Sequence, residues 1–448
     1  MKKGMREGMK TFRDPVHNII QFDKVEERLL LDLIDAPEFQ RLHHIKQLGF
    51  SFLTYPGAEH TRFSHSLGVV HLMKRFLDKI IQETRGEARR YAEELKERRL
   101  LALAAALLHD IGHGPFSHAL EKTTNLRHEH WTIAIILGNT TIHQILETYR
   151  TGFAQEVADV IQRTHSSRAV VKLLSSQLDV DRMDYLLRDA QMTGAGYGRF
   201  DLEWLIHTLR IGEMDGEVQV GLDREKGLSI AEDFIMARYY MFVHVYLHKT
   251  TRSAELMIDK IFERAVELEK KGEMVLPEEL SKLLNQKGTS GILPQYLSLT
   301  DYTLWYYISQ WRKHEDPILR DLSRRILDRD LYKSISIPYD MPTLFQRVKE
   351  IASKLNLSPP MDKYLFLRDE ASGIPYKDPY LSQSTVTGEK ESEREASERV
   401  ILFDEAGRGE ELSEISDLVR LIRSKRLSIQ RIYVPKEIKV ELLTGKEG

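Results

Sequence analysis

A histidine and an aspartate stand side by side at the end of the longest apolar run of the chain. His109 and Asp110 directly follow this run, which covers residues 100–108. A buried carboxylate without a partner costs free energy, so a His-Asp pair at this place needs a partner. A divalent cation bound by both side chains would supply one. A hydrogen bond between the two side chains at a helix end would also do so, and the dipeptide alone favours this simpler interpretation.

Two further residues favour the metal. His65 lies at the start of a predicted helix, and Asp181 lies in an acidic segment, where its simplest reading is a solvated helix start. Two imidazoles and two carboxylates leave positions on a six-coordinate ion for water and substrate, which suits Mn, Fe, Mg or Zn. Ten of the 17 histidines lie between His60 and His165, so this interval is where we expect chemistry.

The overall composition excludes several classes of protein. The 448 residues include 65 Lys and Arg, 68 Asp and Glu and no Cys, for a net charge of −3. Disulfides and thiolate metal sites are therefore excluded. The near-neutral charge argues against a chain that mainly coats nucleic acid, although it is compatible with a local groove that binds nucleic acid. The run at 100–108 is too short to span a bilayer and the N-terminus lacks an apolar signal, so we expect no membrane partner and a cytoplasmic protein.

Helical periodicity dominates the elements that must position these residues. The spacing predicts helices around 66–83 and 89–110, a hairpin near 210–222, and one long helix from Ser229, in a capping-box signature with Glu232, to about residue 269. After residue 333 short β-like runs appear, among them 334–337, 364–367, 400–403, 431–434 and 438–443. We predict a mainly α fold, with a helical bundle core at 1–335 and a smaller C-terminal α+β region at 336–448. A charged loop near 382–398 is expected to be mobile.

Six ordered strings resemble the HD-domain deoxynucleoside triphosphate triphosphohydrolases. They are DPVH at 14–17, DAPEFQRL at 35–42, IKQLG at 45–49, RFSHSLGV at 62–69, HDIGHGPFSH at 109–118 and DVDRMDY at 179–185. The match covers about residues 10–335 and is similar to bacterial enzymes of that group and to the vertebrate SAM-and-HD-domain enzyme without its SAM domain. The resemblance implies an HD-domain helical bundle in which His65, His109, Asp110 and Asp181 bind a divalent metal. Water would then attack the α-phosphorus, and deoxynucleoside and intact triphosphate would leave.

The resemblance also implies roles for other residues. A triphosphate carries about four negative charges and needs cations and proton donors. The residues that match phosphate contacts are Arg62, Arg182, Arg238, His113 and His118, of which His118 is also a candidate general acid. His128 and Glu129 match a second catalytic pair. Gln47, Tyr185 and Asp189 match residues that bind the 3′-hydroxyl, and Leu48 and Tyr246 match residues that crowd the sugar and disfavour ribose.

Relatives of this kind are often homotetramers activated by nucleotides at subunit interfaces, so the resemblance implies a nucleotide effector and a homotetramer. Asp35 and Gln40 match positions that read guanine, but His43 stands where the family has an arginine, which leaves the effector open. Lys10, Arg224 and Lys226 match basic residues near the allosteric site.

Two other functions stay open from the sequence. Another HD hydrolase, such as a nucleotide monophosphatase or a cyclic-nucleotide phosphodiesterase, would keep the metal ligands without needing Gln47, Tyr185 and Asp189. A nucleotide-sensing or nucleic-acid-binding scaffold would keep a metal for structure alone.

Overall fold

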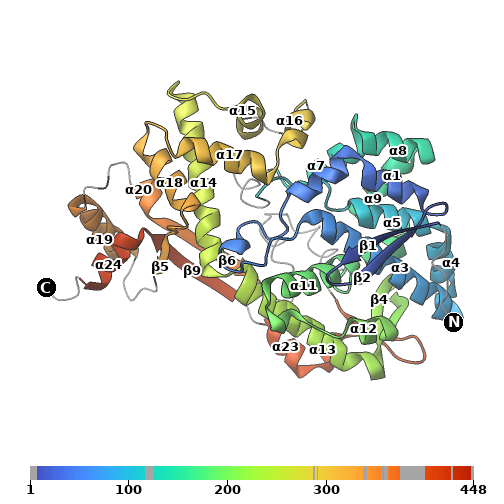
Figure 1. Ribbon diagram of the computed structural model, residues 1–448. Helices are drawn as coiled ribbons and strands as arrows, with labels where there is room; N and C mark the ends of the chain where they lie inside the picture. Colours follow the sequence, from blue (N-terminus) through green and yellow to red (C-terminus); the bar gives the residue numbers. More distant parts are fainter. Residues whose placement is uncertain are drawn as a thin grey trace.

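The computed structural model describes residues 8–116, 126–285, 288–289, 291–335, 341–355, 357, 362–373, 399–424 and 427–444. His118 and the predicted charged loop at 382–398 lie outside these residues. Within them the chain is mainly helical with small sheets, which confirms the predicted fold class (Figure 1). Among the described residues, no helix combines the length and the apolar character needed to cross a bilayer.

Helices of the first half surround one apolar helix, α5 (Arg99–Leu108), in which residues 101–108 are at most 3% exposed. Such a helix, apolar on all sides, is typical of the centre of a bundle. The helices that pack against it include α1 (Arg28–Asp35), α3 (Arg62–Glu83), α4 (Arg89–Glu97), α9 (Phe153–Ile161) and α10 (Arg168–Leu174). The other helices of this half are α2 (Pro37–Gln40), α7 (His128–Leu137), α8 (Thr141–Tyr149), α11 (Val180–Thr193) and α12 (Leu202–Thr208), with the short turns η1 (Arg41–His44), η2 (Ser51–Leu53), η3 (Gly86–Ala88) and η4 (Gly196–Gly198).

The helix predicted from Ser229 to residue 269 is interrupted in the structure. α13 (Arg224–Met241) begins earlier than predicted, because the Asp223 side chain accepts hydrogen bonds from the backbone N–H groups of Glu225 and Lys226. A π-helical turn, η5 (Phe242–Tyr246), follows it, and α14 (Lys249–Lys270) starts anew with His248 as its N-cap. The apolar periodicity continues across this break, so it gave no signal for the turn. π-helical turns are often found at functional sites.

The second half of the chain is built around α14, which lies at its centre in Figure 1. The other helices of this half are α15 (Glu278–Asn285), α16 (Leu293–Ser298), α17 (Asp301–Trp311), α18 (Pro317–Leu327), α19 (Met341–Lys354), α20 (Asp362–Leu365), α22 (Leu412–Ile415), α23 (Asp417–Ser424) and α24 (Lys436–Thr444). The prediction of a strand at 438–443 is wrong, because this segment lies in α24. Ile438 and Leu442, four residues apart, are buried, whereas Val440 between them is 47% exposed.

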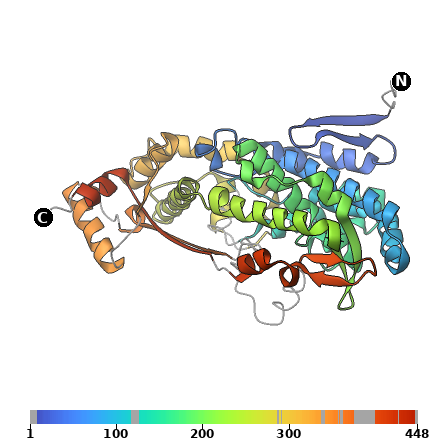
Figure 2. The same ribbon diagram turned by 90° about the horizontal axis from the view of Figure 1, so that it is seen from below.

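Three small sheets complete the described fold. β1 (Met9–Asp14) and β2 (Asn18–Asp23) form an N-terminal antiparallel hairpin. β3 (Leu209–Met214) and β4 (Glu217–Asp223) form a second hairpin, which β7 (Ile401–Phe403) extends as a parallel neighbour of β4, with β8 (Gly409–Glu411) beyond it. β5 (Lys333–Ile335), β9 (Leu427–Val434) and β6 (Leu367–Gly373) form the third. Figure 2 shows the C-terminal red strands beside the green hairpin, so the region after 335 packs onto the earlier core as well.

Candidate metal centre and active site

The His-Asp pair is fixed where α5 ends. His109 follows the last helical residue, Leu108, and its Nδ1 lies 2.9 Å from the carbonyl oxygen of Ala106. Because a carbonyl only accepts, Nδ1 carries the hydrogen and Nε2 is left as a ligand atom. The chain then turns at Gly112, where an added Cβ would lie 2.1 Å from the backbone nitrogen of Thr132 on α7. Glycine is required by this close approach, which seats the turn against α7.

The structure brings the four predicted metal ligands together from α3, the end of α5 and α11. Asp181 Oδ1 lies 3.0 Å from His65 Nε2 and 3.4 Å from His109 Nε2. The Asp110 carboxylate lies 3.7 Å from His65 Nε2 and 3.5 Å from His109 Nε2. Asp181 is the most open of the four, with its side chain 31% exposed. This leaves one side of the group accessible to a ligand.

The donor set fits a divalent cation. The Nε2 atoms of His65 and His109 are buried, and no partner in the described part of the chain meets them in hydrogen-bond geometry. Ligand atoms of His65, His109 and Asp181 lie within 4.8 Å of one another, close enough to share one ion. Two imidazole nitrogens and two carboxylates suit Mn, Fe, Mg or Zn, and the side chains alone do not distinguish among them.

Charges at the cluster act strongly on one another. Burial alone would raise the pKa of Asp110, but the nearby His109, His113 and Arg62 outweigh it and bring that pKa well below its usual range. Burial lowers the pKa of His65, but contacts with Asp181 and Asp184 outweigh it and raise the pKa to about 10. Without a metal, the protonated imidazole of His65 is therefore favoured, with Nδ1 facing Asp184 and Nε2 facing Asp181.

We expect divalent metal binding to release protons. At pH 7 a cation must displace the proton on His65, so metal affinity should rise by about tenfold per pH unit for each proton released and level off only near pH 10. Calorimetric titration of Mn²⁺ in two buffers of different ionisation enthalpy measures the proton count, and a titration series from pH 6 to 8 measures the slope. Binding that is independent of pH, with no proton released, would contradict this expectation.

A second group lies directly beside the first. The His113 ring stacks on the His128 ring at 3.7 Å, and His113 Nε2 lies 3.4 Å from Asp110. Burial, Arg62 and His128 together lower the pKa of His113 well below its usual range, so this imidazole is neutral. Glu129 bonds to the Arg127 guanidinium, and its carboxylate lies 3.7 Å from His128 Nδ1, beyond hydrogen-bond range. The predicted His128–Glu129 pair is therefore adjacent without a direct hydrogen bond.

The three arginines predicted to bind phosphate are all buried. Arg62 donates to the Asp110 carboxylate, so it lies at the metal cluster itself. Arg182 donates to the Ser176 carbonyl oxygen at 2.7 Å and pairs with Asp179, whereas Arg238 donates to Gln177. The short segment 176–179 thus holds two guanidinium groups.

The predicted sugar-binding residues form a connected group. The Tyr246 hydroxyl donates to Asp189 at 2.8 Å, and the Tyr246 and Tyr185 rings lie 6.3 Å apart. Gln47 donates its backbone N–H to the His60 carbonyl oxygen, and its buried side-chain oxygen has no partner among the described residues. Leu48, next to it, is half-buried and packs against the apolar core.

Two residues without a predicted role lie at the site. His60 Nε2 lies 2.7 Å from Asp189, and Asp184 Oδ2 lies 2.8 Å from His65 Nδ1. Both residues are buried. The only sequence signal for them was their place in the histidine-rich interval and in the string at 179–185, which gave no partner.

The predicted effector residues are spread over several helices and one strand. Asp35 ends α1, Gln40 ends α2 with its amide donating to the Ile34 carbonyl oxygen, and the exposed His43 stacks on Phe63 at 3.6 Å. The remaining three are all exposed: Lys10 on β1, and Arg224 and Lys226 at the start of α13, where Arg224 pairs with Glu410.

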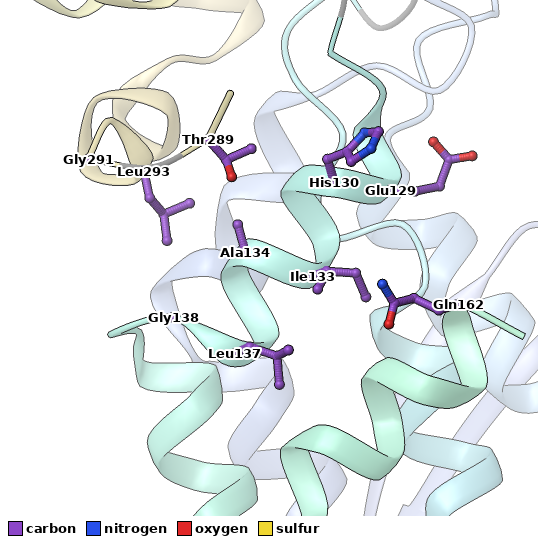
Figure 3. Close-up of a pocket in the computed structure, with 10 residues that line it drawn as sticks. All are labelled: Glu129, His130, Ile133, Ala134, Leu137, Gly138, Gln162, Thr289, Gly291 and Leu293. Carbon is purple, nitrogen blue, oxygen red and sulfur yellow. The ribbon is translucent and has the colours of Figure 1, made fainter. Parts of the chain in front are cut away.

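A separate cavity of about 620 Å³ lies beside α7 (Figure 3). Ile133, Ala134 and Leu137 on α7 line it, with Leu293 on one side and Gln162 on the other. Glu129 and His130 lie at one end. Among the described residues that line it there is none of the four predicted metal ligands, so it is distinct from the metal cluster.

Two known protein families match parts of the sequence. Residues 62–189 match the HD domain, and residues 200–353 match the HD associated region. The metal cluster lies wholly within the first of these ranges. The second range contains η5 and α14.

Relatives over nearly the whole chain are also found. The uncharacterized protein YwfO of Bacillus subtilis is 39% identical over 432 residues, which cover 96% of this chain and 93% of that one. Deoxynucleoside triphosphate triphosphohydrolase SAMHD1 of Gallus gallus is 28% identical over 83% of this chain and 61% of its own length. The crystal structure of a phosphohydrolase from Bacteroides thetaiotaomicron is 27% identical, with a TM-score of 0.78 over 96% of this chain and 100% of that one.

Proposed function

Because the chain belongs to the HD-domain phosphohydrolase family, we propose that it hydrolyses deoxynucleoside triphosphates to a deoxynucleoside and inorganic triphosphate. The observation that carries this proposal is the convergence of His65, His109, Asp110 and Asp181, with the Arg62 guanidinium bonded to Asp110. The similarity to SAMHD1, whose name describes this reaction, supports the same substrate class.

Divalent metal bound by His65, His109, Asp110 and Asp181 would polarise a phosphate oxygen and make an attacking water more acidic. The reaction forms a bond from that water to the α-phosphorus and breaks the bond from the α-phosphorus to the 5′-oxygen. The leaving 5′-oxygen must gain a proton. His128 stacks on His113 beside Asp110 and is 19% exposed, so it is the described histidine best suited to deliver that proton.

Other residues of the chain would orient the nucleotide. Arg62, Arg182 and Arg238 are guanidinium groups that stay charged when buried and can bind phosphate oxygens in pairs. Asp189 and the side-chain oxygen of Gln47 are acceptors suited to a sugar hydroxyl. The Tyr246 ring, bonded through its hydroxyl to Asp189, would occupy the space that a ribose 2′-hydroxyl needs.

The resemblance also supports a nucleotide effector and assembly into a homotetramer. Asp35, His43, Lys10, Arg224 and Lys226 are exposed, as residues that meet a ligand or a neighbouring subunit must be before they bind it. In a homotetramer, exposed residues of this kind can contribute to an effector site that is shared with a second subunit. Testing each dNTP alone and in pairs would detect such an effector as a mixture that is hydrolysed when its components are not.

The product of the reaction tests the proposed function. We expect incubation with Mn²⁺ or Mg²⁺ and dNTPs to yield deoxynucleoside and triphosphate in equal amounts, resolved by ion-exchange chromatography. In ¹⁸O-water the label should enter the triphosphate and not the deoxynucleoside, because water attacks phosphorus. Release of phosphate or pyrophosphate would point to another HD phosphohydrolase, and nucleotide binding without turnover at any metal would point to a sensor.

A further inference from the structure

A buried ionic cluster links the N-terminal hairpin to the metal site. We call it the Asp184 cluster; it consists of Asp14, His17, His65, Asp184 and Arg188. Asp14 ends β1 and His17 lies in the turn before β2, while Asp184 and Arg188 lie one turn apart on α11. Figure 2 shows the dark-blue hairpin on the outside of the helical bundle, so this turn reaches inward from the surface.

Asp184 is surrounded by donors. Its Oδ1 lies 2.7 Å from His17 Nε2 and accepts from Arg188 Nη2 at 3.0 Å, and its Oδ2 lies 2.8 Å from both His65 Nδ1 and Arg188 Nε. The side chains of these four residues are at most 2% exposed. Because water has no access, every contact of this carboxylate is provided by the protein.

The contact with Asp184 determines which nitrogen of His65 can bind a metal. An ionised carboxylate only accepts hydrogen bonds, so His65 Nδ1 must carry a hydrogen. Nε2, which faces Asp181 and Asp110, is then the nitrogen available for a cation. A carboxylate bonded to the far nitrogen of a histidine ligand also fixes the ring orientation and increases its basicity.

The turn between β1 and β2 also holds Asp184 in place. Asp14 Oδ1 accepts the backbone N–H groups of Val16 and His17 at 2.9 Å each, which shapes the turn that directs the His17 ring at Asp184. Asp14 also accepts from Arg188 Nη1 at 2.7 Å. The Arg188 guanidinium is thus shared between two carboxylates. Because Arg188 also pairs with Asp14, it does not fully neutralise Asp184, and Asp184 keeps negative charge for its contacts with His17 and His65.

We propose that Asp14 and His17 are positioning residues of the N-terminal hairpin that set the metal affinity of His65 through Asp184 and Arg188. The inference rests on the proposed metal site and goes beyond it. In the contacts of the described residues, Asp14 and His17 meet neither the exposed side of the metal cluster nor a residue predicted to bind substrate. The same hairpin carries Lys10, so a ligand or subunit that moves β1 has a route of two side-chain contacts to a metal ligand.

Titration of Mn²⁺ by calorimetry at pH 7.5 tests this role without depending on turnover. We expect His17→Ala to bind Mn²⁺ about tenfold more weakly than the natural chain, at the low end of the 10- to 100-fold loss typical for a direct partner of a metal ligand, because His17 contacts Asp184 and not His65 itself. His17→Gln, whose amide can still donate to Asp184, should recover most of that loss. Gln21→Ala is the matched control, since Gln21 lies on β2 of the same hairpin and its side chain bonds, among the described residues, to Thr11 alone.

Wild-type Mn²⁺ affinity in a folded His17→Ala protein would overturn the inference. If His17→Ala does not fold, Asp14→Asn decides, because asparagine keeps the oxygen that shapes the turn and replaces the oxygen that accepts from Arg188 by an uncharged donor group. We expect a several-fold loss of Mn²⁺ affinity there with an unchanged circular dichroism spectrum, and an unchanged affinity would overturn the inference. If the natural chain binds Mn²⁺ but hydrolyses no dNTP, the proposed function fails and this test stands.

Discussion

Replacing Asp110 by alanine is expected to lower turnover by about 10³-fold or more and to remove the bound metal. The carboxylate contacts both histidine ligands and the Arg62 guanidinium. Loss of a metal that supplies several kcal/mol of transition-state stabilisation corresponds to a rate loss of this size. Metal content by mass spectrometry and initial rates of triphosphate release measure the two effects.

The controls for Asp110→Ala separate chemistry from folding. Alanine leaves Arg62 as a buried charge without its carboxylate, which destabilises a protein on its own. Asp110→Asn keeps the size of the side chain, so it should lose activity with a smaller loss of melting temperature. Asp78→Ala on α3 removes an exposed carboxylate paired with Arg99 and should change neither property. A metal-loaded, fully active Asp110→Ala protein would refute the assigned ligand set.

Replacing Gly68 by alanine is expected to destabilise the protein by about 3–5 kcal/mol, the range for disrupting a buried ion pair. An added Cβ at Gly68 would lie 1.8 Å from Asp184 Oδ1 and 2.5 Å from Arg188 Nη2. Either α3 must move away from α11 or the Asp184 cluster must open. The effect has the opposite sign to helix propensity, which favours alanine over glycine by about 1 kcal/mol.

Urea denaturation followed by circular dichroism measures this change in the free energy of unfolding. Gly196→Ala is the matched control, because an added Cβ at Gly196 would have no atom within 4 Å. We expect the Gly68→Ala protein also to bind Mn²⁺ weakly, since His65 and Gly68 lie on one face of α3. Equal stability of the two variants would show that α3 and α11 do not approach as closely as described.

The sequence contained enough to predict the helical class, and the four residues it proposed as metal ligands do lie together. Helical periodicity and the apolar run at 100–108 indicated a bundle, and the ordered strings indicated which histidines and carboxylates belong together. The roles of Asp184 and His60 could not be predicted, because each depends on a contact between residues more than a hundred positions apart. A sequence pattern reports what repeats locally and contains no signal for such pairings.

Local patterns also misled where tertiary contacts decide. The run at 438–443 alternates apolar and charged residues as a strand does. It nevertheless forms part of α24, because Ile438 and Leu442 are buried together on one face of that helix. The periodicity from 229 to 269 is helical throughout, and only the structure shows the turn at Phe242–Tyr246 that brings the Tyr246 hydroxyl to Asp189. The N-terminal hairpin had no alternating pattern strong enough to predict.

The parallel pairing of β7 with β4 bears on how the chain folds during synthesis. Gly221 is aligned with Ile401, 180 positions later in the chain. A ribosome that has just made β4 has not yet made the strand that pairs with it. Until residues 401–403 emerge, the edge of β4 stays exposed, and an exposed strand edge can pair with another nascent chain. Completion of this sheet therefore cannot precede the synthesis of residues 401–403.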